Sequence, residues 1–249
     1  MHFELEGRVA IVTGASRGLG RAIAVALLEQ GAQVLAAARS AGDLQSLQAL
    51  APERTRVAAC DLRDTAAVAG LADAAVAAFG RLDIVVNNAG IAPAAPFLEQ
   101  VEETWRDVMS VNVLAPMVLA RVAGRHMIDR GSGKIINIAS TSGLLGKASL
   151  VAYSASKGAL LQFTKALAAE WAGAGIQVNA IAPGAFATDA QRVVLDSPDL
   201  LARRLRKIPA KRLGNAVEIG ALVCYLAADR SSFVTGSVFV IDGGESCCL

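Results

Sequence analysis

The hydrophobic positions of the chain form two kinds of segment that alternate along its 249 residues. Short runs of Val, Ile and Ala, such as 9–12, 84–86 and 135–138, hold almost no polar residue, which is typical of strands buried on both faces. Longer runs rich in Ala and Leu follow and predict helices. We expect strands at 8–14, 32–38, 55–60, 82–88, 133–140, 176–184 and 236–244, and helices at 20–31, 43–50, 64–79, 102–130 (as two helices), 152–173 and 215–228.

The regular alternation of strand and helix predicts the fold class. Strands separated by helices form a parallel sheet with right-handed crossovers and helices on both faces. No Pro/Ser-rich linker and no repeat beyond the strand–helix rhythm interrupts the chain. We therefore expect residues 1–249 to form a single doubly wound α/β domain. Residues 185–214 are expected to be irregular with one helical piece, and to act as a flexible substrate lid.

The composition argues against several classes of function. The chain is 54% hydrophobic and 18% charged, and its formal net charge is +2. This balance supports a sizeable core and gives no reason to expect nucleic acid or a membrane surface as partner. The longest uncharged apolar stretches, such as 108–120, are shorter than the roughly 20 residues of a membrane span, and no signal peptide is recognisable. We expect a cytoplasmic protein.

The cysteines and histidines do not indicate a metal site. The four cysteines, Cys60, Cys224, Cys247 and Cys248, show no CxxC spacing and lie near no histidine, so we expect free thiols that are buried or terminal. The two histidines, His2 and His126, are too few to favour a Ser-His-Asp triad. We expect His126 to lie on a helix surface.

A glycine-rich turn, VTGASRGLGRA, joins the first predicted strand to the first helix. Its glycines, Gly14, Gly18 and Gly20, follow a G-x-x-x-G-x-G spacing. Glycines permit a tight turn and a close backbone approach, and a helix N-terminus offers free N–H groups to a pyrophosphate. The alternative is a simple turn, but its place at the first strand–helix junction favours a dinucleotide site.

The end of the second strand bears on which dinucleotide would bind. NAD-binding proteins usually carry Asp or Glu there for the ribose 2′-hydroxyl. This chain has Ala38 followed by Arg39, and Arg17 lies in the glycine-rich turn. Guanidinium groups can pair with a 2′-phosphate. We therefore expect NADP(H) to be preferred over NAD(H); the alternative is that Arg39 is a solvated loop residue.

The segment LVAYSASKGALL (150–161) places Tyr153 and Lys157 four residues apart in an apolar run. Four residues make about one helical turn, so the two side chains share a face of the predicted helix. One interpretation is a catalytic pair. The other is a surface aromatic residue beside a solvated lysine.

Several motifs accompany this pair in a specific order. They are TGASRGLG (13–20), NNAG (87–90), Asn112 in SVNVLAP, Ser140 in INIASTSG, YSASK (153–157), NAIAPG (179–184) and DGG (242–244). On these motifs the chain resembles the short-chain dehydrogenase/reductase family, in its simple branch of roughly 250 residues, and the resemblance covers essentially the whole chain. It implies a Rossmann-like fold with a seven-stranded parallel sheet, and a homotetramer or homodimer.

The resemblance also implies roles for the matching residues. Tyr153 would be the catalytic acid/base, Lys157 its support and a ligand of the nicotinamide ribose, Ser140 the residue that orients the substrate oxygen, and Asn112 the holder of a proton-relay water. Asp61 and Leu62 would meet the adenine, and Thr188 the carboxamide. The expected cofactor-binding set is Gly14, Ser16, Arg17, Gly18, Leu19, Gly20, Arg39, Asp61, Leu62, Asn88, Ala89, Gly90, Tyr153, Lys157, Pro183, Gly184, Phe186 and Thr188.

The implied chemistry is consistent with first principles. A free tyrosine has a pKa of about 10, too high for a base near neutrality. A nearby cation favours the phenolate, so we expect Lys157 and an oxidised nicotinamide to lower the pKa of Tyr153. In the reducing direction, Tyr153 would protonate the carbonyl oxygen while Ser140 donates a hydrogen bond to it.

The substrate is not determined by the sequence. Leu144, Leu145, Leu150 and Phe186 suggest a mainly apolar pocket. The segment RRLRKIPAKR (203–212) carries six basic side chains, which form either the solvated face of a lid helix or a landing site for an acidic partner. A carrier-protein or coenzyme A thioester would suit the second interpretation and would indicate 3-oxoacyl reduction. The alternative substrate is a sugar or polyol ketone, as in gluconate 5-dehydrogenase-like members.

Two further alternatives concern function class and assembly. A non-catalytic nucleotide-sensing regulator could use the same fold, but such a sensor has no need of the proton donor at Tyr153. Helices 102–130 and 152–173 are apolar on more than one face, through residues such as Val111, Leu114, Leu160 and Leu161. Their excess apolar surface predicts an oligomer interface, or alternatively deeper burial within one subunit.

Overall fold

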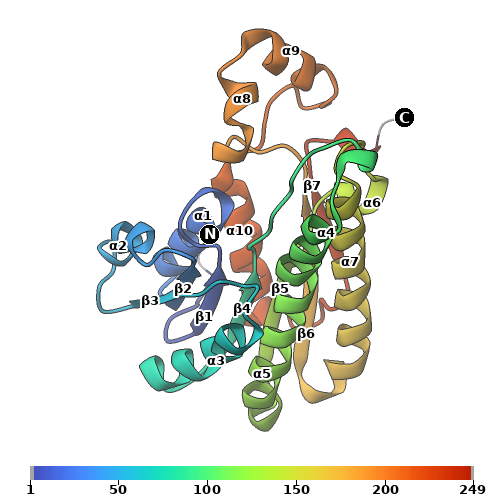
Figure 1. Cartoon of the computed structure of the whole chain (residues 1–249). Helices are drawn as coiled ribbons and strands as arrows, with labels where there is room; N and C mark the ends of the chain where they lie inside the picture. Colours follow the sequence, from blue (N-terminus) through green and yellow to red (C-terminus); the bar gives the residue numbers. More distant parts are fainter. Residues whose placement is uncertain (1–2, 248–249) are drawn as a thin grey trace.

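Seven parallel strands form one sheet in the computed structural model, which describes residues 3–247 (Figure 1). The strand order is β3-β2-β1-β4-β5-β6-β7, so the direction of strand addition reverses between β1 and β4. The strands are β1 (Val9–Thr13), β2 (Gln33–Ala38), β3 (Thr55–Ala59), β4 (Ile84–Asn87), β5 (Gly133–Ile138), β6 (Ile176–Pro183) and β7 (Val238–Ile241). All seven predicted strands are present, and the Rossmann-like doubly wound α/β fold is confirmed.

Helices cover both faces of this sheet (Figure 1). They are α1 (Gly18–Glu29), α2 (Gly42–Gln48), α3 (Thr65–Phe79), α4 (Glu102–Met109), α5 (Ala115–Arg130), α6 (Ser142–Leu145), α7 (Val151–Trp171), α8 (Arg192–Leu195), α9 (Pro198–Arg206) and α10 (Ala216–Ala227). The stretch 102–130 forms two helices, α4 and α5, as predicted. A π-helical turn, Ser110–Leu114, joins them without a break.

Alternate residues of each central strand supply two separate cores. Ala10 and Val12 pack in a cluster with α1, α2 and α10, whereas Val9 and Ile11 pack with α3, α5 and α7. All four side chains are fully buried. Because both faces are covered, the central strands need no polar positions, and this explains their uninterrupted apolar sequence.

Polar residues at the helix ends explain where several helices begin and end. The Asp64 side chain accepts hydrogen bonds from the N–H groups of Ala66 and Ala67 at the start of α3, and Gly80 ends that helix with a φ of 82°. Asn215 and Glu218 form a reciprocal capping box at the start of α10. These caps satisfy backbone groups that have no partner inside the helix.

The stretch 102–130 is long and apolar enough to cross a membrane by length and composition, although 56% of its most apolar window is buried within the structure. It packs against α3, α7 and strands of the sheet, as the core helix of a globular domain does.

His126 lies on the surface of α5, 3.1 Å from Asp73, as expected. Cys60 and Cys224 are buried free thiols and Cys247 is exposed. His2 and Cys248 lie outside the described residues.

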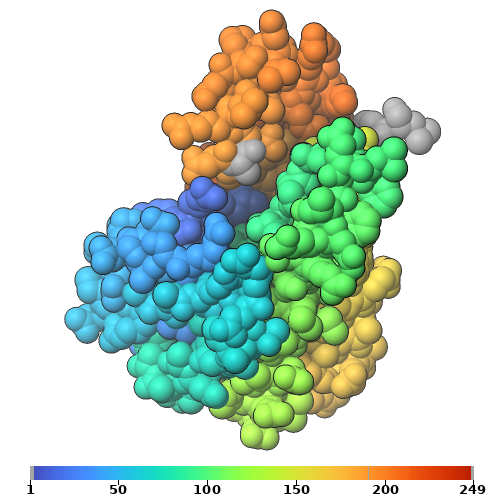
Figure 2. Space-filling view, viewed as in Figure 1, coloured from blue at the N-terminus to red at the C-terminus, as the bar shows by residue number. Residues whose placement is uncertain are grey.

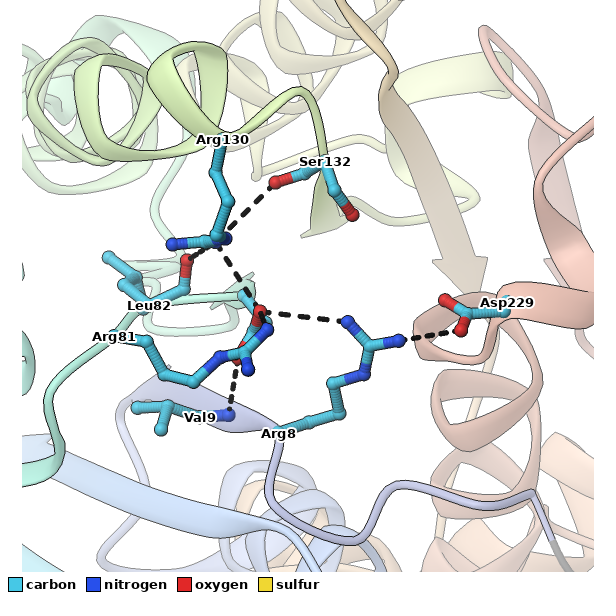
Figure 3. Close-up of polar contacts among 8 residues, drawn as sticks. Arg8, Val9, Arg81, Leu82, Arg130, Ser132 and Asp229 are labelled. Atoms are coloured by element: carbon cyan, nitrogen blue, oxygen red, sulfur yellow. Dashed lines mark hydrogen bonds and ion pairs between the residues drawn. The ribbon is translucent and has the colours of Figure 1, made fainter.

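The amino end of the sheet is held together by a buried carboxylate. Asp83, only 3% exposed, precedes β4 and accepts hydrogen bonds from the Val9 N–H (2.9 Å) and from two nitrogens of Arg81 (2.7 and 2.8 Å). Arg130 and Arg8 also pair with it, at 3.3 and 3.7 Å, and Arg8 continues to Asp229 at 2.6 Å (Figure 3). One carboxylate thereby links β1, β4 and the end of α5.

Replacing Asp83 by Asn keeps the side-chain shape and removes this charge. We expect the free energy of unfolding to fall by about 2–3 kcal/mol, somewhat below the cost of breaking a fully buried pair, because the three guanidinium side chains remain 26–41% exposed and can be hydrated. Urea unfolding measures the change. Asp229→Asn is the control: its side chain is 74% exposed, so a loss below about 1 kcal/mol is expected. Equal losses in both variants would contradict the central role of Asp83.

Candidate active site

A cavity of about 490 Å³ opens at the carboxyl ends of the strands, where the direction of strand addition reverses between β1 and β4. Open α/β sheets bind their ligands at such a point. In Figure 2 the segment that carries α8 and α9 (orange) stands above the body, and the surface is recessed beneath it. Every residue that the sequence analysis assigned to dinucleotide binding lines this cavity. Residues far apart in the sequence are therefore brought to one site.

The glycine-rich turn fits a pyrophosphate. Gly14 and Gly18 have φ values of +67° and +55°, which disfavour other residues, and a Cβ on Gly20 would lie 2.2 Å from the Gly14 carbonyl oxygen. Helix α1 starts at Gly18 with no side-chain cap at Arg17 and no acidic residue in its first turn. Its first N–H groups therefore remain available to an anion, so the site fits the phosphates of a dinucleotide.

Charged side chains gather at the β2–β3 side of the cavity. Arg17 and Arg39 are exposed there, and neither forms an ion pair with any residue that the structure describes. Asp61 lines the same region with Leu62 beside it. Hydrogen bonds from Arg63 lower the pKa of Asp61 to about 2, with a smaller contribution from Arg39, so the carboxylate stays ionised at any physiological pH.

Three of the four expected catalytic residues meet on the floor of the cavity. Ser140 follows β5, and Tyr153 and Lys157 lie one turn apart near the start of α7. The Lys157 Nζ donates a hydrogen bond to the Ile138 carbonyl oxygen at 2.7 Å and lies 5.8 Å from the centre of the Tyr153 ring. A side chain at Gly90 would come within 3.4 Å of this ammonium nitrogen. The pair therefore lines the cavity, and the alternative of a surface aromatic residue beside a solvated lysine does not hold.

Burial shifts the pKa values of both members of the pair. Burial raises the pKa of Tyr153, and the hydrogen bond with Ser140 offsets this only in part. Burial also lowers the pKa of Lys157 from 10.5 to about 8. Removal of both groups from water favours their neutral forms. That Lys157 and an oxidised nicotinamide together lower the pKa of Tyr153 stays a prediction.

Asn112 lies behind the cavity instead of lining it. It sits in the π-helical turn and is fully buried. Its Oδ1 accepts from the Ile91 N–H at 2.9 Å, and its Nδ2 donates to the Ile91 carbonyl and to Ser156 Oγ, both at 3.0 Å. Ser156 in turn donates to the Tyr153 carbonyl at 2.7 Å. Asn112 thus connects the chain after β4 to the helix that carries Tyr153.

Several residues that were predicted to line or flank the substrate pocket have different surroundings in the structure. Phe186 is buried and lines the cavity, but Leu144 and Leu145 are 45% and 64% exposed and do not line it. Two of the six basic residues of 203–212 are neutralised, since Arg204 pairs with Glu245 and Arg212 with Glu218. Both the apolar lining and the basic landing site are therefore smaller than predicted.

The cavity also contains residues that the sequence analysis missed. Arg63, Asp107 and Val111 line it beside Asp61. Asp107 and Val111 are four residues apart, across the junction of α4 and the π-helical turn, a spacing that indicates one helix face. Nothing in the sequence shows that this face meets the end of β3, since that contact depends on the packing of α4.

No group of three or more His, Cys, Asp or Glu residues that could hold a metal ion occurs within residues 3–247.

Comparisons with known proteins agree with this geometry. Residues 14–246 match the family model described as enoyl-(acyl carrier protein) reductase. The chain is 39% identical to 2-dehydro-3-deoxy-D-gluconate 5-dehydrogenase of Bacillus subtilis, covering 97% of this chain and 96% of the relative. It is 37% identical to the 3-oxoacyl-(acyl-carrier-protein) reductase FabG of Salmonella typhimurium, over 96% and 97%.

A solved structure gives the same relationship in three dimensions. The gluconate 5-dehydrogenase of Burkholderia cenocepacia, crystallised with NADP and tartrate, superposes with a TM-score of 0.94 at 35% identity, covering 100% of this chain and 98% of that one. Fold, cavity and relatives together define an oxidoreductase built on a dinucleotide-binding sheet. More specifically, the chain belongs to the short-chain dehydrogenase/reductase family, whose members act on CH–OH groups.

Replacing Lys157 by Met removes the buried cation and keeps a long apolar chain. A pKa lowered from 10.5 to about 8 means that the protonated lysine costs roughly 3 kcal/mol of stability. The variant should therefore unfold at a higher urea concentration at pH 7. Its free energy of unfolding should exceed that of the wild type by up to about 2 kcal/mol once the lost hydrogen bond to Ile138 is counted.

The pH dependence of the free energy of unfolding tests whether the buried Lys157 charge causes this difference in stability. The unfolded chain binds the Lys157 proton more tightly than the folded chain, so the wild-type free energy of unfolding rises between pH 8 and pH 10.5 through this residue. The advantage of Lys157→Met should shrink over the same interval. An advantage that is independent of pH would show that burial of the charge is not its source.

Proposed function

We propose that this protein is an NADP(H)-dependent oxidoreductase that interconverts a ketone and a secondary alcohol, with Tyr153 as acid/base. The observation that carries the proposal is the position of Tyr153, Ser140 and Lys157 on the floor of a cavity whose rim fits a dinucleotide. Arg17 and Arg39, two exposed cations that form no ion pair within residues 3–247, and the absence of a carboxylate at Ala38 support NADP(H) over NAD(H).

Each residue of the site has a separate role in the proposed hydride and proton transfer. The dinucleotide, when bound, supplies or accepts the hydride. Tyr153 donates its phenolic proton to the carbonyl oxygen, and its raised pKa keeps the proton in place until the oxygen becomes basic. Ser140 donates a hydrogen bond to the same oxygen. Lys157, held by the Ile138 carbonyl, stabilises the phenolate that remains. Asn112 positions the chain behind them.

The chain is proposed to act as one catalytic domain, 1–249, in the cytoplasm, with 185–214 as the substrate lid. Homo-oligomer formation, as a tetramer or dimer, is supported by exposed apolar side chains on the 102–130 stretch, namely Met109, Leu114, Met117 and Ile128. Three residues assigned earlier to an interface, Val111, Leu160 and Leu161, are instead buried within the subunit. Neither a membrane nor nucleic acid is proposed as a partner.

Two substrate classes remain in the proposal. A hydroxy or oxo derivative of a sugar acid is placed first, because gluconate-type dehydrogenases recur among both the sequence relatives and the solved structures and because Leu144 and Leu145 do not line the cavity. A 3-oxoacyl thioester is second. It is supported by the FabG relative and by Arg203, Arg206 and Lys207 on the lid, which are exposed and have no carboxylate partner within residues 3–247.

Replacing Tyr153 by Phe removes only the proton donor. Turnover should fall by at least about 10³-fold, while the Kd for NADPH changes less than about threefold. NADPH oxidation at 340 nm with a panel of 5-oxo sugar acids, polyol ketones and short 3-oxoacyl thioesters measures the first quantity, and fluorescence titration measures the second. Retained turnover would contradict the assignment. Tight NADPH binding by the wild type with no turnover on any carbonyl would favour a nucleotide-sensing regulator.

Replacing Arg39 by Ala tests the cofactor preference. The guanidinium has no carboxylate partner among residues 3–247, so its loss should weaken NADPH binding by about tenfold or more through the lost charge-assisted bonds and leave NADH binding nearly unchanged. The ratio of the two Kd values is the readout. Arg56→Ala is a matched control, since that guanidinium bonds to backbone carbonyls of Pro52 and Thr55 and does not line the cavity. Equal or tighter NADH binding by the wild type would overturn the preference.

A further inference from the structure

Arg63 has no role in the mechanism above, yet it lines the dinucleotide cavity with Asp61 and Asp107. It belongs to the turn between β3 and α3, whereas Asp107 belongs to α4. Arg63 and Asp107 are 44 residues apart in sequence, and Arg63 contacts carboxylates on both sides of the cavity. This contact spans the region where the family resemblance places the adenine.

The contacts to Asp61 are close and involve both of its oxygens. Asp61 Oδ1 accepts from the Arg63 N–H at 3.0 Å and from Nε at 3.2 Å. Oδ2 accepts from Nε at 3.1 Å and from Nη2 at 2.6 Å. A carboxylate with several donors from one residue has little freedom to rotate. Arg63 therefore holds the Asp61 carboxylate in one orientation.

The contact to Asp107 extends this arrangement to the opposite wall. Arg63 Nη1 lies 3.5 Å from Asp107 Oδ2. Asp107 is one helical turn before Val111, which also lines the cavity. The distance between the β3–α3 turn and α4 is thus set partly by a single guanidinium group. A flat purine that enters between these walls meets a gap whose width is already established.

The charges distinguish Arg63 from the other arginines of the cavity. Arg63 is paired with two carboxylates, whereas Arg17 and Arg39 have no such partner among the described residues. A guanidinium neutralised in this way has little attraction left for a 2′-phosphate. Asp61, by contrast, stays an ionised acceptor, which suits the exocyclic amino group of adenine and disfavours the carbonyl oxygen of hypoxanthine.

We propose that Arg63 and Asp107 form a bridge that positions Asp61 and closes the purine end of the cavity, so that this end selects a 6-amino purine. The inference deepens the proposed function and rests on it, because the purine belongs to the proposed dinucleotide. Arg63 and Asp107 are positioning residues: they act through Asp61 and through the width of the gap.

The test compares Arg63→Met with the wild type on four probes: NADPH, NADH, the hypoxanthine analogue of NADPH, and reduced nicotinamide mononucleotide, which has no purine. Because the bridging groups are 39–51% exposed, we expect the Kd for NADPH and for NADH to rise by the same factor, about fivefold. The wild type should bind NADPH more tightly than its hypoxanthine analogue, and the variant should lose most of that preference. Turnover with the mononucleotide should be unchanged.

Three further variants separate positioning from general damage. Arg63→Lys keeps the charge but not the fork of donors and should recover part of the preference for adenine. Asp107→Asn should raise the Kd for NADPH by about twofold. Glu102→Gln breaks the exposed Arg106–Glu102 pair on the same helix, outside the cavity, and should change nothing. Thermal unfolding of each variant confirms that it is folded.

Several results would contradict the proposed role of Arg63 and Asp107 as a bridge. An unchanged Kd in Arg63→Met would do so, as would a loss confined to NADPH, which would make Arg63 a phosphate ligand. An equal loss of turnover with the mononucleotide would indicate a general structural role. Wild-type protein that binds no dinucleotide would overturn the proposed function and the bridge together, whereas wild-type binding with an unaffected variant overturns the bridge alone.

Discussion

The burial of the Lys157 ammonium group is the constraint on which the site depends. The side chain is 3% exposed, and its Nζ donates a hydrogen bond to the Ile138 carbonyl at the end of β5. A cation is costly to bury in this way, and the lowered pKa of Lys157 is the direct sign of that cost. The surrounding parts accommodate the charge: Gly90 leaves room for it, and α7 presents Tyr153 one turn away. Stability is therefore lowered here by a charge that lies 5.8 Å from the centre of the Tyr153 ring.

The two ends of the sheet use charge in opposite ways. At the amino end, Asp83 is enclosed by Arg8, Arg81 and Arg130, so that its charge is neutralised and its hydrogen bonds are made. At the carboxyl end, the first turn of α1, Arg17 and Arg39 have no such partners within the described chain. The difference follows from the parallel sheet, which places all strand starts at one edge and all strand ends at the other. One edge holds the fold together, and the other remains available to a ligand.

The walls of the cavity also differ in how firmly they are tied. At the end of β3, Arg63 pairs with both Asp61 and Asp107. The proposed lid, 185–214, is attached towards its carboxyl end, where Arg204 pairs with Glu245 and the Ala210 N–H bonds to the Gly243 carbonyl. Helices α8 and α9 precede or include these attachments and stand clear of the sheet (Figure 1). The proposed cofactor half is therefore linked by an ion pair between its walls, whereas the helices of the proposed substrate half project from the sheet.

The sequence by itself determined the fold class, the seven strands and the residues of the glycine-rich turn, because buried strands and helix ends leave local patterns of apolar residues, glycines and caps. The motifs likewise predicted Ser140, Tyr153 and Lys157 as site residues, and all three line the same cavity. Other features were decided only by tertiary structure. The π-helical turn that buries Asn112, the raised pKa of Tyr153, the neutralised arginines of the lid and the bridge from Arg63 to Asp107 all depend on contacts between distant elements. Burial and partner distance control each of these properties, and neither quantity is recorded in the local sequence.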